Sequence, residues 1–274
     1  MTIKNTVKEY SKHLINITHI PAKEVEILIL HLLRKNIIWL HLNYNEEFTK
    51  ENALKELVEK RKNNFPLEYL TCKASFYGEQ FHVQEGVLIP RPETEILIEK
   101  VLPLLEKLAH PKIIEIGVGS GIISVMLARL IPNITIIAVD INDKALELAK
   151  KNALYHEVSH KITFLHSNLF ENIKEDKYDM VVSNPPYIKN NFDLEKNVKY
   201  EPSNALFGGE EGDELLKKII LETKNRNIDY LACEMGYDQE KPLRSFINNF
   251  EYKKLEFYKD YENFDRGFTL SFKK

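Results

Sequence analysis

The sequence predicts a doubly wound α/β sheet with an antiparallel last strand, preceded by a small helical bundle and a β-hairpin linker. From residue 112 onward, short runs rich in Ile, Val and Leu alternate with helical patterns, which is typical of buried parallel strands and their crossovers. A short polar turn joins the last two apolar runs, which predicts an antiparallel pair. The first 75 residues show only helical periodicity. We therefore expect a helical bundle over residues 1–75, a linker over 76–90 and an α/β domain over 91–274.

Each expected element follows from its periodicity. In the bundle, Val7, Tyr10, Leu14 and Ile17 share one helix face, a second helix covers residues 22–35, and a third begins after Thr49 and carries apolar residues over 53–58. The expected strands cover residues 112–116, 134–140, 162–166, 178–183, 230–234, 253–258 and 268–273. The expected helices between them cover residues 122–130, 143–152, 213–224 and 238–250.

Composition limits the classes of function. The chain has 274 residues and a net charge of -3, whereas proteins that bind nucleic acid through its phosphates usually carry a basic surplus, so nucleic-acid binding is disfavoured. Cys72 and Cys233 lie outside any CxxC spacing, so we expect neither a disulfide nor structural zinc. His156 and His160 lack an acidic or Cys partner at a ligand spacing, so we expect no metal. Without an apolar leader, a cytoplasmic protein with no membrane contact is expected.

A glycine-rich turn follows the first expected strand of the α/β domain. It reads Glu115-Ile116-Gly117-Val118-Gly119-Ser120-Gly121 and leads into a helix. Glycines there let the backbone approach a ligand, and the helix N-terminus offers free N–H groups. Ile122 stands where a dinucleotide fingerprint has its third glycine, which disfavours NAD and FAD. Taken alone, such a turn can also serve tight packing.

Asp140 closes the next expected strand. An acidic side chain at that position can accept hydrogen bonds from ribose hydroxyls. Helix capping is the structural alternative, although Asn142 or Asp143 can also cap the helix. Together, the glycine turn and Asp140 predict a nucleoside-bearing cofactor without identifying it.

The tetrad Asn184-Pro185-Pro186-Tyr187 directly follows the expected strand over residues 178–183. Two consecutive prolines remove two backbone donors and fix two φ angles, which predicts a stiff loop with outward carbonyls. An amide nitrogen is a poor nucleophile, but two acceptors that grip its N–H groups can turn its lone pair toward an electrophile. We expect the Asn184 side-chain oxygen and the Pro185 carbonyl to be these acceptors, with Tyr187 stacked on the planar group. An ordinary rigid loop is the alternative for an isolated tetrad.

In this order, the three motifs resemble those of class I methyltransferases that act on amino nitrogens. Further segments resemble the PrmC/HemK family of release factor glutamine N5-methyltransferases, and the resemblance covers roughly residues 61–270. The combination of LIPRPETE with NPPY is its most specific part. The segments are Pro66-Leu-Glu-Tyr-Leu70, Phe76-Tyr-Gly78, Val87 to Glu95, Tyr200-Glu-Pro202, Ala205-Leu206, Gly208-Gly209, Glu234-Met-Gly236, and Asp260-Tyr261 with Arg266.

The resemblance implies a class I methyltransferase domain over residues 91–274, with S-adenosylmethionine as methyl donor and S-adenosylhomocysteine as product. It implies that the acceptor is the glutamine in the Gly-Gly-Gln motif of peptide chain release factors, so that translation termination is modulated, with residues 1–75 docking the release factor. By position, the cofactor would contact Glu115, Gly117, Val118, Gly119, Ser120, Gly121, Asp140, Leu169 and Asn184, and the glutamine would contact Asn184, Pro185, Pro186 and Tyr187.

Two positions depart from the family pattern. Cys72 stands where relatives commonly have glycine, which affects a detail of the linker. Asn168 stands where an acidic residue is frequent beside the adenine. Because an amide oxygen can still accept from the adenine amino group, we expect weaker selectivity there and not its loss.

Two further segments have a structural and a functional interpretation. Pro90 and Pro92 stiffen the start of a helix, and Arg91 between them is unusual for a purely structural turn, so we expect it in the wall of the substrate channel. Residues 200–209 lie in a connection too long for a simple crossover, which predicts either a lid over the site or a surface loop.

Three functions are compatible with these motifs. A glutamine methyltransferase is the leading hypothesis. An amino-nitrogen methyltransferase acting on DNA or RNA bases is the alternative, since NPPY suits any planar amine, but the acidic balance disfavours it. The third is a non-catalytic module that holds a nucleoside while the bundle docks a partner, and the intact motifs argue against it.

Overall fold

The computed structural model describes residues 1–174 and 176–272. The chain it describes divides into two compact units, which we treat separately. The first unit comprises residues 1–73 and 194–200, and the second comprises residues 74–193 and 201–274. Lys273, the last residue of the strand expected over 268–273, lies outside the described residues.

The first unit is a helical bundle around its own apolar core, which includes Val7, Leu28 and Leu54. Thr2 caps the first helix by accepting from the Asn5 N–H at 3.3 Å, and Pro21 occupies the first turn of the second, where its missing N–H costs nothing. The helices are α1 (Ile3–Ser11), α2 (Pro21–Leu33), α3 (Ile37–Leu42), α4 (Glu51–Lys62) and α5 (Leu67–Thr71).

Several expected boundaries in this unit were wrong. Because α1 ends at Ser11, Leu14 and Ile17 lie beyond it, with Leu14 in a 3₁₀ turn. The second helix, α2, ends at Leu33, and α4 is preceded by Lys50 as its cap in place of Thr49. The short helices α3 and α5 were not predicted. The six residues of α3 are almost all apolar, so they lack a helical period, and the helix begins where the Asn36 side chain accepts from the Trp39 N–H at 2.9 Å.

Residues 194–200 return to this first unit from the long connection after NPPY. The Tyr200 ring lies 5.1 Å from the Phe65 ring, edge to face. The Tyr200 hydroxyl donates to the Asn63 carbonyl at 2.8 Å. Part of the expected lid segment is thus bound within the helical unit.

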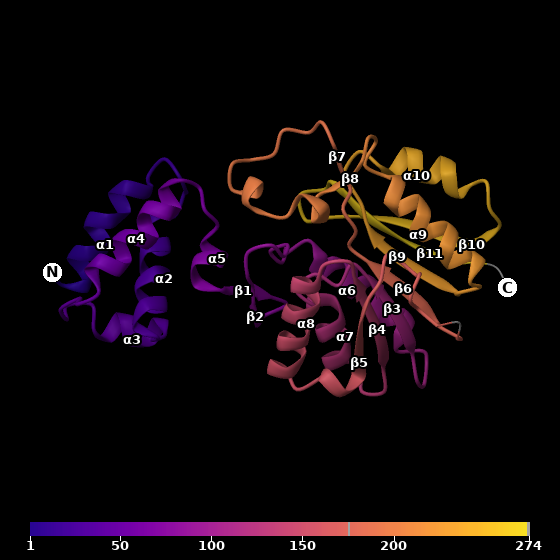
Figure 1. The fold of residues 1–274 in the computed structure, drawn as a ribbon, viewed down its shortest axis with the longest axis horizontal. Coiled ribbons are helices and arrows are strands. Elements are labelled where there is room, and N and C mark those ends of the chain that lie inside the picture. The colour runs from indigo at the N-terminus through magenta and orange to yellow at the C-terminus, as the bar shows by residue number, and fades with distance from the viewer. Residues whose placement is uncertain (175, 273–274) are drawn as a thin grey trace. The chain divides into compact units, whose positions relative to one another are not determined.

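The second unit contains a sheet that has seven strands within the described residues, in the order β10-β11-β9-β6-β3-β4-β5 (Figure 1). The five strands from β9 to β5 are parallel, and β11 is antiparallel to both β9 and β10, which confirms the predicted last strand. The strands are β3 (Lys112–Ile116), β4 (Thr135–Asp140), β5 (Ile162–His166), β6 (Met180–Ser183), β9 (Tyr230–Glu234), β10 (Tyr252–Lys259) and β11 (Asp265–Phe272).

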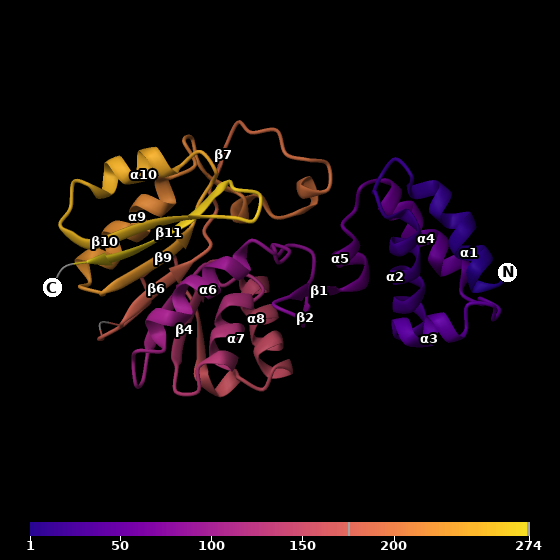
Figure 2. The ribbon, with the colours of Figure 1, turned by 180° about the vertical axis from the view of Figure 1, so that it is seen from behind.

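Helices cover both faces of this sheet, as Figures 1 and 2 show. One face, with Ile113 and Val182, packs against α6 (Thr94–Leu105), α7 (Ile122–Leu130) and α8 (Asp143–Tyr155). The other face, with Ile114 and Val181, packs against α9 (Glu214–Asn225) and α10 (Glu240–Ile247). Neighbouring strand residues therefore face opposite cores, as expected for strands buried on both sides.

In this unit the type of each expected helix or strand was usually right, whereas its first and last residues were often wrong. The strand expected from residue 178 begins at Met180, the helix expected over 238–250 spans only Glu240–Ile247, and the last strand begins at Asp265. The linker is the hairpin β1 (Lys73–Phe76) and β2 (Glu79–His82). A small parallel sheet of β7 (Ile188–Lys189) and β8 (Phe207–Gly209) was not predicted, because such short strands show no period.

The course of the chain through the sheet reverses between β3 and β6. From β3 the chain proceeds to β4 and β5 on one side, whereas β6 and β9 lie on the other. Ile116 pairs with Ser183, whose hydroxyl donates to the Ile116 carbonyl at 2.7 Å. The glycine turn and the NPPY tetrad therefore emerge side by side at a topological switch point, where ligands bind in sheets of this kind.

None of the helices in the described part of the chain is long and apolar enough to cross a membrane.

Candidate active site

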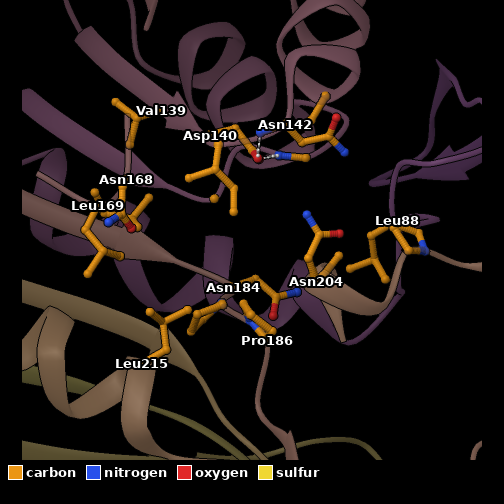
Figure 3. Close-up of a pocket in the computed structure, with 18 of the residues that line it drawn as sticks. Leu88, Val139, Asp140, Asn142, Asn168, Leu169, Asn184, Pro186, Asn204 and Leu215 are labelled. Carbon is orange, nitrogen blue, oxygen red and sulfur yellow. Dashed lines mark hydrogen bonds between the residues drawn. The ribbon is translucent and has the colours of Figure 1, made fainter. Parts of the chain in front are cut away.

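A cleft opens at the carboxyl ends of the parallel strands of the second unit (Figure 3). The empty space in it, including its open mouth, is about 790 Å³. Asp140 and Asn142 line one wall and Asn184, Pro186 and Leu215 the opposite one, with Asn168 and Leu169 at one end and Leu88 and Asn204 at the other.

The glycine turn is fixed to the end of β4 by hydrogen bonds. The Gly117 and Val118 N–H groups both donate to the Val139 carbonyl at 2.9 Å, and the Gly119 N–H donates to Asp140 Oδ2 at 2.9 Å. Gly117 and Gly119 have φ of 74° and 52°, a left-handed conformation that favours glycine. The turn thus brings bare backbone to the cleft.

Gly121 has a different role. Among the residues that the structure describes, Gly121 is not one of those that line the cleft. A Cβ added at Gly121 would lie only 3.0 Å from the Cβ of Ala149 on α8. Gly121 is the N-cap residue of α7 and has a left-handed φ of 84°. The expected cofactor contact of Gly121 thus stays a prediction, while the structure gives it a packing function between α7 and α8.

Asp140 is held with both oxygens oriented. Besides Gly119, the Asn142 N–H donates to Asp140 Oδ1 at 2.9 Å. Burial raises the pKa of Asp140, while the backbone N–H groups bound to it act in the opposite direction. A carboxylate oxygen can accept more than one hydrogen bond, so Asp140 can accept from a ligand without giving up its backbone contacts.

Glu115 presents an unsatisfied oxygen. Its Oε2 accepts from the Ser124 N–H at 2.9 Å and from the Ser124 hydroxyl, whereas its Oε1 has no hydrogen-bond partner among the described residues. Burial raises the pKa of Glu115 to about 8. A buried acceptor without a partner is rare in folded proteins and indicates a missing donor.

This oxygen belongs to the wall of a smaller pocket that adjoins the cleft. The two share Leu88, Gly117, Gly119 and Asn184. The smaller pocket is also lined by Arg91, Thr94, Glu115, Val118 and Ser120. A ligand that occupies both would meet Asp140 at one end and Glu115 at the other.

The Asn184 side chain takes part in a hydrogen-bond chain that leads into the interior of the second unit. Its Nδ2 donates to Thr94 Oγ1 at 3.0 Å, and the Thr94 hydroxyl donates to Glu234 Oε2 at 2.6 Å. Thr94 begins α6, and Glu234 ends β9. Burial raises the pKa of Glu234 to about 7, with the Thr94 hydrogen bond and the Arg266 charge opposing it.

The proline corner is enclosed by the segment around β8. A Cβ at Gly208 would lie 2.4 Å from the Pro186 carbonyl oxygen, and one at Gly212 would lie 2.5 Å from that of Tyr187. The Tyr187 carbonyl also accepts from Gln239 Nε2 at 2.9 Å. This close approach requires glycine at both positions and restrains the corner from outside.

Pro185 and Pro186 line the cleft. Tyr187 is not among the described residues that line it. Its ring packs against the core on the α9 side of the sheet. Burial, together with the nearby Glu234, raises the pKa of Tyr187 to about 12, while Arg266 opposes the shift. The expected stacking of this ring on the acceptor stays a prediction.

Arg91 pairs with Glu201 from the expected lid segment. Its Nη2 lies 2.5 Å from Glu201 Oε1, and Glu201 Oε2 accepts from the Ile89 N–H at 3.0 Å. Pro202, Asn204 and Ala205 line the cleft. This segment forms a wall of the cleft, held to the LIPRPETE region by an ion pair.

Most predicted residues meet at these two pockets. Several contributors escaped prediction from the sequence, because their roles depend on partners far along the chain. Asn142 was considered only as a helix cap, although its Nδ2 also donates to the Gly86 carbonyl at 2.8 Å. The signals that could have revealed Glu234 are an acidic residue at the end of a buried strand and its place in Glu234-Met-Gly236, a segment of the family resemblance, as Val87 to Glu95 is for Leu88 and Thr94. The others are Leu88, Thr94, Asn204 and Leu215.

The strand order, the antiparallel last pair and a switch-point cleft formed by a glycine turn and NPPY define a class I methyltransferase. The methyltransferase small domain family matches residues 93–201, and the PrmC N-terminal domain family matches residues 6–71. The chain belongs to the release factor glutamine methyltransferase family.

Relatives of that name align along most of the chain. The one from Fusobacterium nucleatum is 36% identical and aligns with 90% of this chain and 72% of its own length. The one from Aquifex aeolicus is 36% identical, with 89% of both chains covered, and that from Buchnera aphidicola is 34% identical, with 97% and 98% covered. The bifunctional methyltransferase of Rickettsia typhi is 33% identical over 92% of this chain, which spans about half (54%) of that protein.

Solved structures agree at the level of the fold. The human methyltransferase 10 domain containing protein matches with a TM-score of 0.55 at 19% identity, covering 72% of this chain and 90% of that one. The N-terminal domain of human METTL16 in complex with SAH matches with a TM-score of 0.52 at 20% identity, covering 69% and 74%. At such low identity, the likeness shows the fold alone.

Proposed function

We propose that this chain transfers a methyl group from S-adenosylmethionine to the side-chain amide nitrogen (N5) of the glutamine in the Gly-Gly-Gln motif of peptide chain release factors. The observation that carries the proposal is the corner Asn184-Pro185-Pro186 in the wall of the switch-point cleft. The 34–38% identical relatives named for release factor glutamine favour a protein acceptor over a nucleic-acid base.

The two pockets suit this methyl donor at both ends. Asp140 can accept from the ribose hydroxyls, and Asn168 and Leu169 lie where an adenine would follow. At the other end, the unpartnered Glu115 Oε1 suits the ammonium group of the methionine portion. When bound, the donor supplies a methyl group on a positively charged sulfonium.

In this account, the protein contributes orientation. Asn184 Oδ1 and the Pro185 carbonyl accept from the two N–H groups of the glutamine amide, so its nitrogen is aimed along the line of transfer. Because those acceptors are held by prolines and by buried contacts, little ordering remains when the acceptor binds. No strong base is needed, since a proton can leave the nitrogen after the methyl group has arrived.

The experiment compares wild type with Asn184→Ala. Purified protein is incubated with S-adenosylmethionine and a release factor, and the Gly-Gly-Gln peptide is examined by mass spectrometry. The wild type should add one methyl group to the glutamine, and Asn184→Ala should abolish it while cofactor binding, measured by calorimetry, is largely kept. An unmodified glutamine with wild type would contradict the proposal, and label on nucleic acid instead would favour the alternative.

The helical unit is proposed to dock the release factor, which acts in the cytoplasm where translation terminates. It has its own core, and Ile38 and Leu42 on α3 are exposed. Exposed apolar side chains of this kind often mark partner surfaces. The double variant Ile38→Glu with Leu42→Glu should raise KM for the release factor without changing kcat, and an unchanged KM would count against docking through α3.

A further inference from the structure

The Asn184 carboxamide has two nearly isosteric orientations, and only one of them presents an oxygen to an acceptor amide. Asn184 Nδ2 faces Thr94 Oγ1 at 3.0 Å, and Thr94 Oγ1 faces Glu234 Oε2 at 2.6 Å. Thr94 is fully buried and Glu234 is 1% exposed. Asn184 is half-buried, and on the side of Thr94 its carboxamide therefore faces protein groups and not water.

The chemistry of the three groups sets the direction of this chain. An ionised carboxylate can only accept, so the Thr94 hydroxyl must give its single proton to Glu234. The Thr94 oxygen is then available only as an acceptor, and the atom of Asn184 that faces it must be Nδ2. The reverse orientation would place Asn184 Oδ1 against the Thr94 oxygen, leaving two buried acceptors without a proton between them.

We propose that Thr94 and Glu234 are positioning residues of the transfer reaction, which together hold the Asn184 carboxamide with its oxygen directed to the acceptor amide. This inference rests on the proposed function, because it assigns a cause to the orientation that the function requires. In this proposal neither residue binds the acceptor, although Thr94 also lines the smaller pocket. Their effect passes through Asn184, and the ends of α6 and β9 that carry them are fixed in the core of the second unit.

Charged and titratable groups surround Glu234 on several sides. The positive charges of Arg266 and Arg91 favour its ionised form, and the charge of Glu93 opposes it. Tyr187, Cys233 and Tyr258 lie close enough that the Glu234 charge raises the pKa of each. If Glu234 gained a proton, it could donate to the Thr94 oxygen, and the Thr94 hydroxyl could then donate to Asn184 Oδ1, which would turn the amide round.

The first test compares Thr94→Val with Thr94→Ser. Valine keeps the volume and removes the hydroxyl, so kcat for the release factor should fall about tenfold, the rate equivalent of one hydrogen bond. KM should stay unchanged, and Thr94→Ser should restore most of kcat. Thr223→Val is the matched control, since Thr223 is also fully buried but donates to the Ile219 carbonyl of its own helix at 2.7 Å.

A direct readout does not require turnover. The side-chain amide protons of Asn184, assigned by nuclear magnetic resonance against Asn184→Asp, should exchange slowly in wild type and in Thr94→Ser, and quickly in Thr94→Val. If wild type failed to methylate the release factor, the proposed function would be contradicted. The exchange rate of the Asn184 amide protons would still show whether Thr94 holds the Asn184 carboxamide. Full kcat or slow exchange in folded Thr94→Val would overturn the inference.

The pH profile provides a second readout that a purely structural role would not move. Burial raises the pKa of Glu234 to about 7, so the ionised form that orients Asn184 prevails above that pH, and kcat should decline below it. Glu234→Gln cannot titrate but can still accept from Thr94 through its Oε1, so its profile should lose this acidic decline. An identical decline in Glu234→Gln would contradict the role of Glu234.

Discussion

Glu115 and Glu234 occupy similar positions on parallel strands of one sheet, yet they have opposite surroundings. Each is 1% exposed, and burial raises the pKa of both, to about 8 and about 7. The Glu234 carboxylate meets the Thr94 hydroxyl and the charges of two arginines, whereas the charged group near Glu115 is Asp140 and its Oε1 lacks a partner in the described chain.

This difference in surroundings indicates a different role for each carboxylate. Glu234 Oε2 accepts from the Thr94 hydroxyl, and in the proposal above this contact lets Glu234 orient another side chain. Glu115 is only half satisfied by Ser124, which leaves Oε1 available to a ligand, and the nearby charge of Asp140 would favour a cationic one, as the proposed function requires. In the proposed function, the cofactor side of the site thus uses Glu115 and the acceptor side uses Glu234, each in a different way.

The largest expected effect separates the two glutamates by cofactor affinity. Glu115→Gln should weaken the binding of S-adenosylhomocysteine about 30-fold, because hydrogen bonds to charged groups contribute about 1.5–3 kcal/mol. Glu234→Gln should leave that Kd unchanged, since its partner is Thr94. Isothermal titration calorimetry measures both. Equal losses in the two variants would remove the distinction between them.

A smaller effect concerns stability and pH. The folded-state pKa of Glu115, about 8, lies above the value of 4.5 expected when unfolded, so its contribution to stability is fully present below pH 4.5 and lost as pH rises toward 8. Glu115→Gln cannot titrate, so it should gain at least about 1 kcal/mol relative to wild type between pH 5 and pH 8.5. Urea unfolding at the two pH values measures this change, and a constant difference would show that Glu115 ionises normally.

The smallest effect concerns the adenine end of the cleft. Asn168 is exposed, and its Nδ2 donates to Glu171 Oε1 at 2.7 Å. Asn168→Asp would replace this amide by a carboxylate, a stronger acceptor for the adenine amino group, and should tighten S-adenosylhomocysteine binding about threefold. Calorimetry with S-inosylhomocysteine, in which an oxygen replaces that amino group, is the control. The same gain with both ligands would contradict a contact to the adenine amino group.

The fold could be predicted from the sequence where local pattern determines structure. The buried runs Lys112–Ile116 and Tyr230–Glu234 were predicted to the residue, because each is a short, mostly apolar run between polar segments. The helix α3 and the strands β7 and β8 were missed, since they depend on a single cap or on contacts between distant segments.

The sequence predicted which loops form the site, but not which side-chain atoms in those loops face the cleft. The glycines predicted the turn after β3, and the prolines predicted the rigid corner after β6. Whether a side chain faces the cleft depends on packing partners elsewhere, which is why Gly121 contacts α8 and the Tyr187 ring packs into the core. Thr94 and Glu234 are 140 residues apart, and no local pattern reveals that they meet.

The most direct test of the account is a crystal structure with S-adenosylhomocysteine and a glutamine peptide from a release factor Gly-Gly-Gln loop. We expect Asn184 Oδ1 and the Pro185 carbonyl both to lie within hydrogen-bond distance of the glutamine amide nitrogen, with that nitrogen pointing at the sulfur. A glutamine held by other groups, or an Asn184 oxygen turned back toward Thr94, would contradict it.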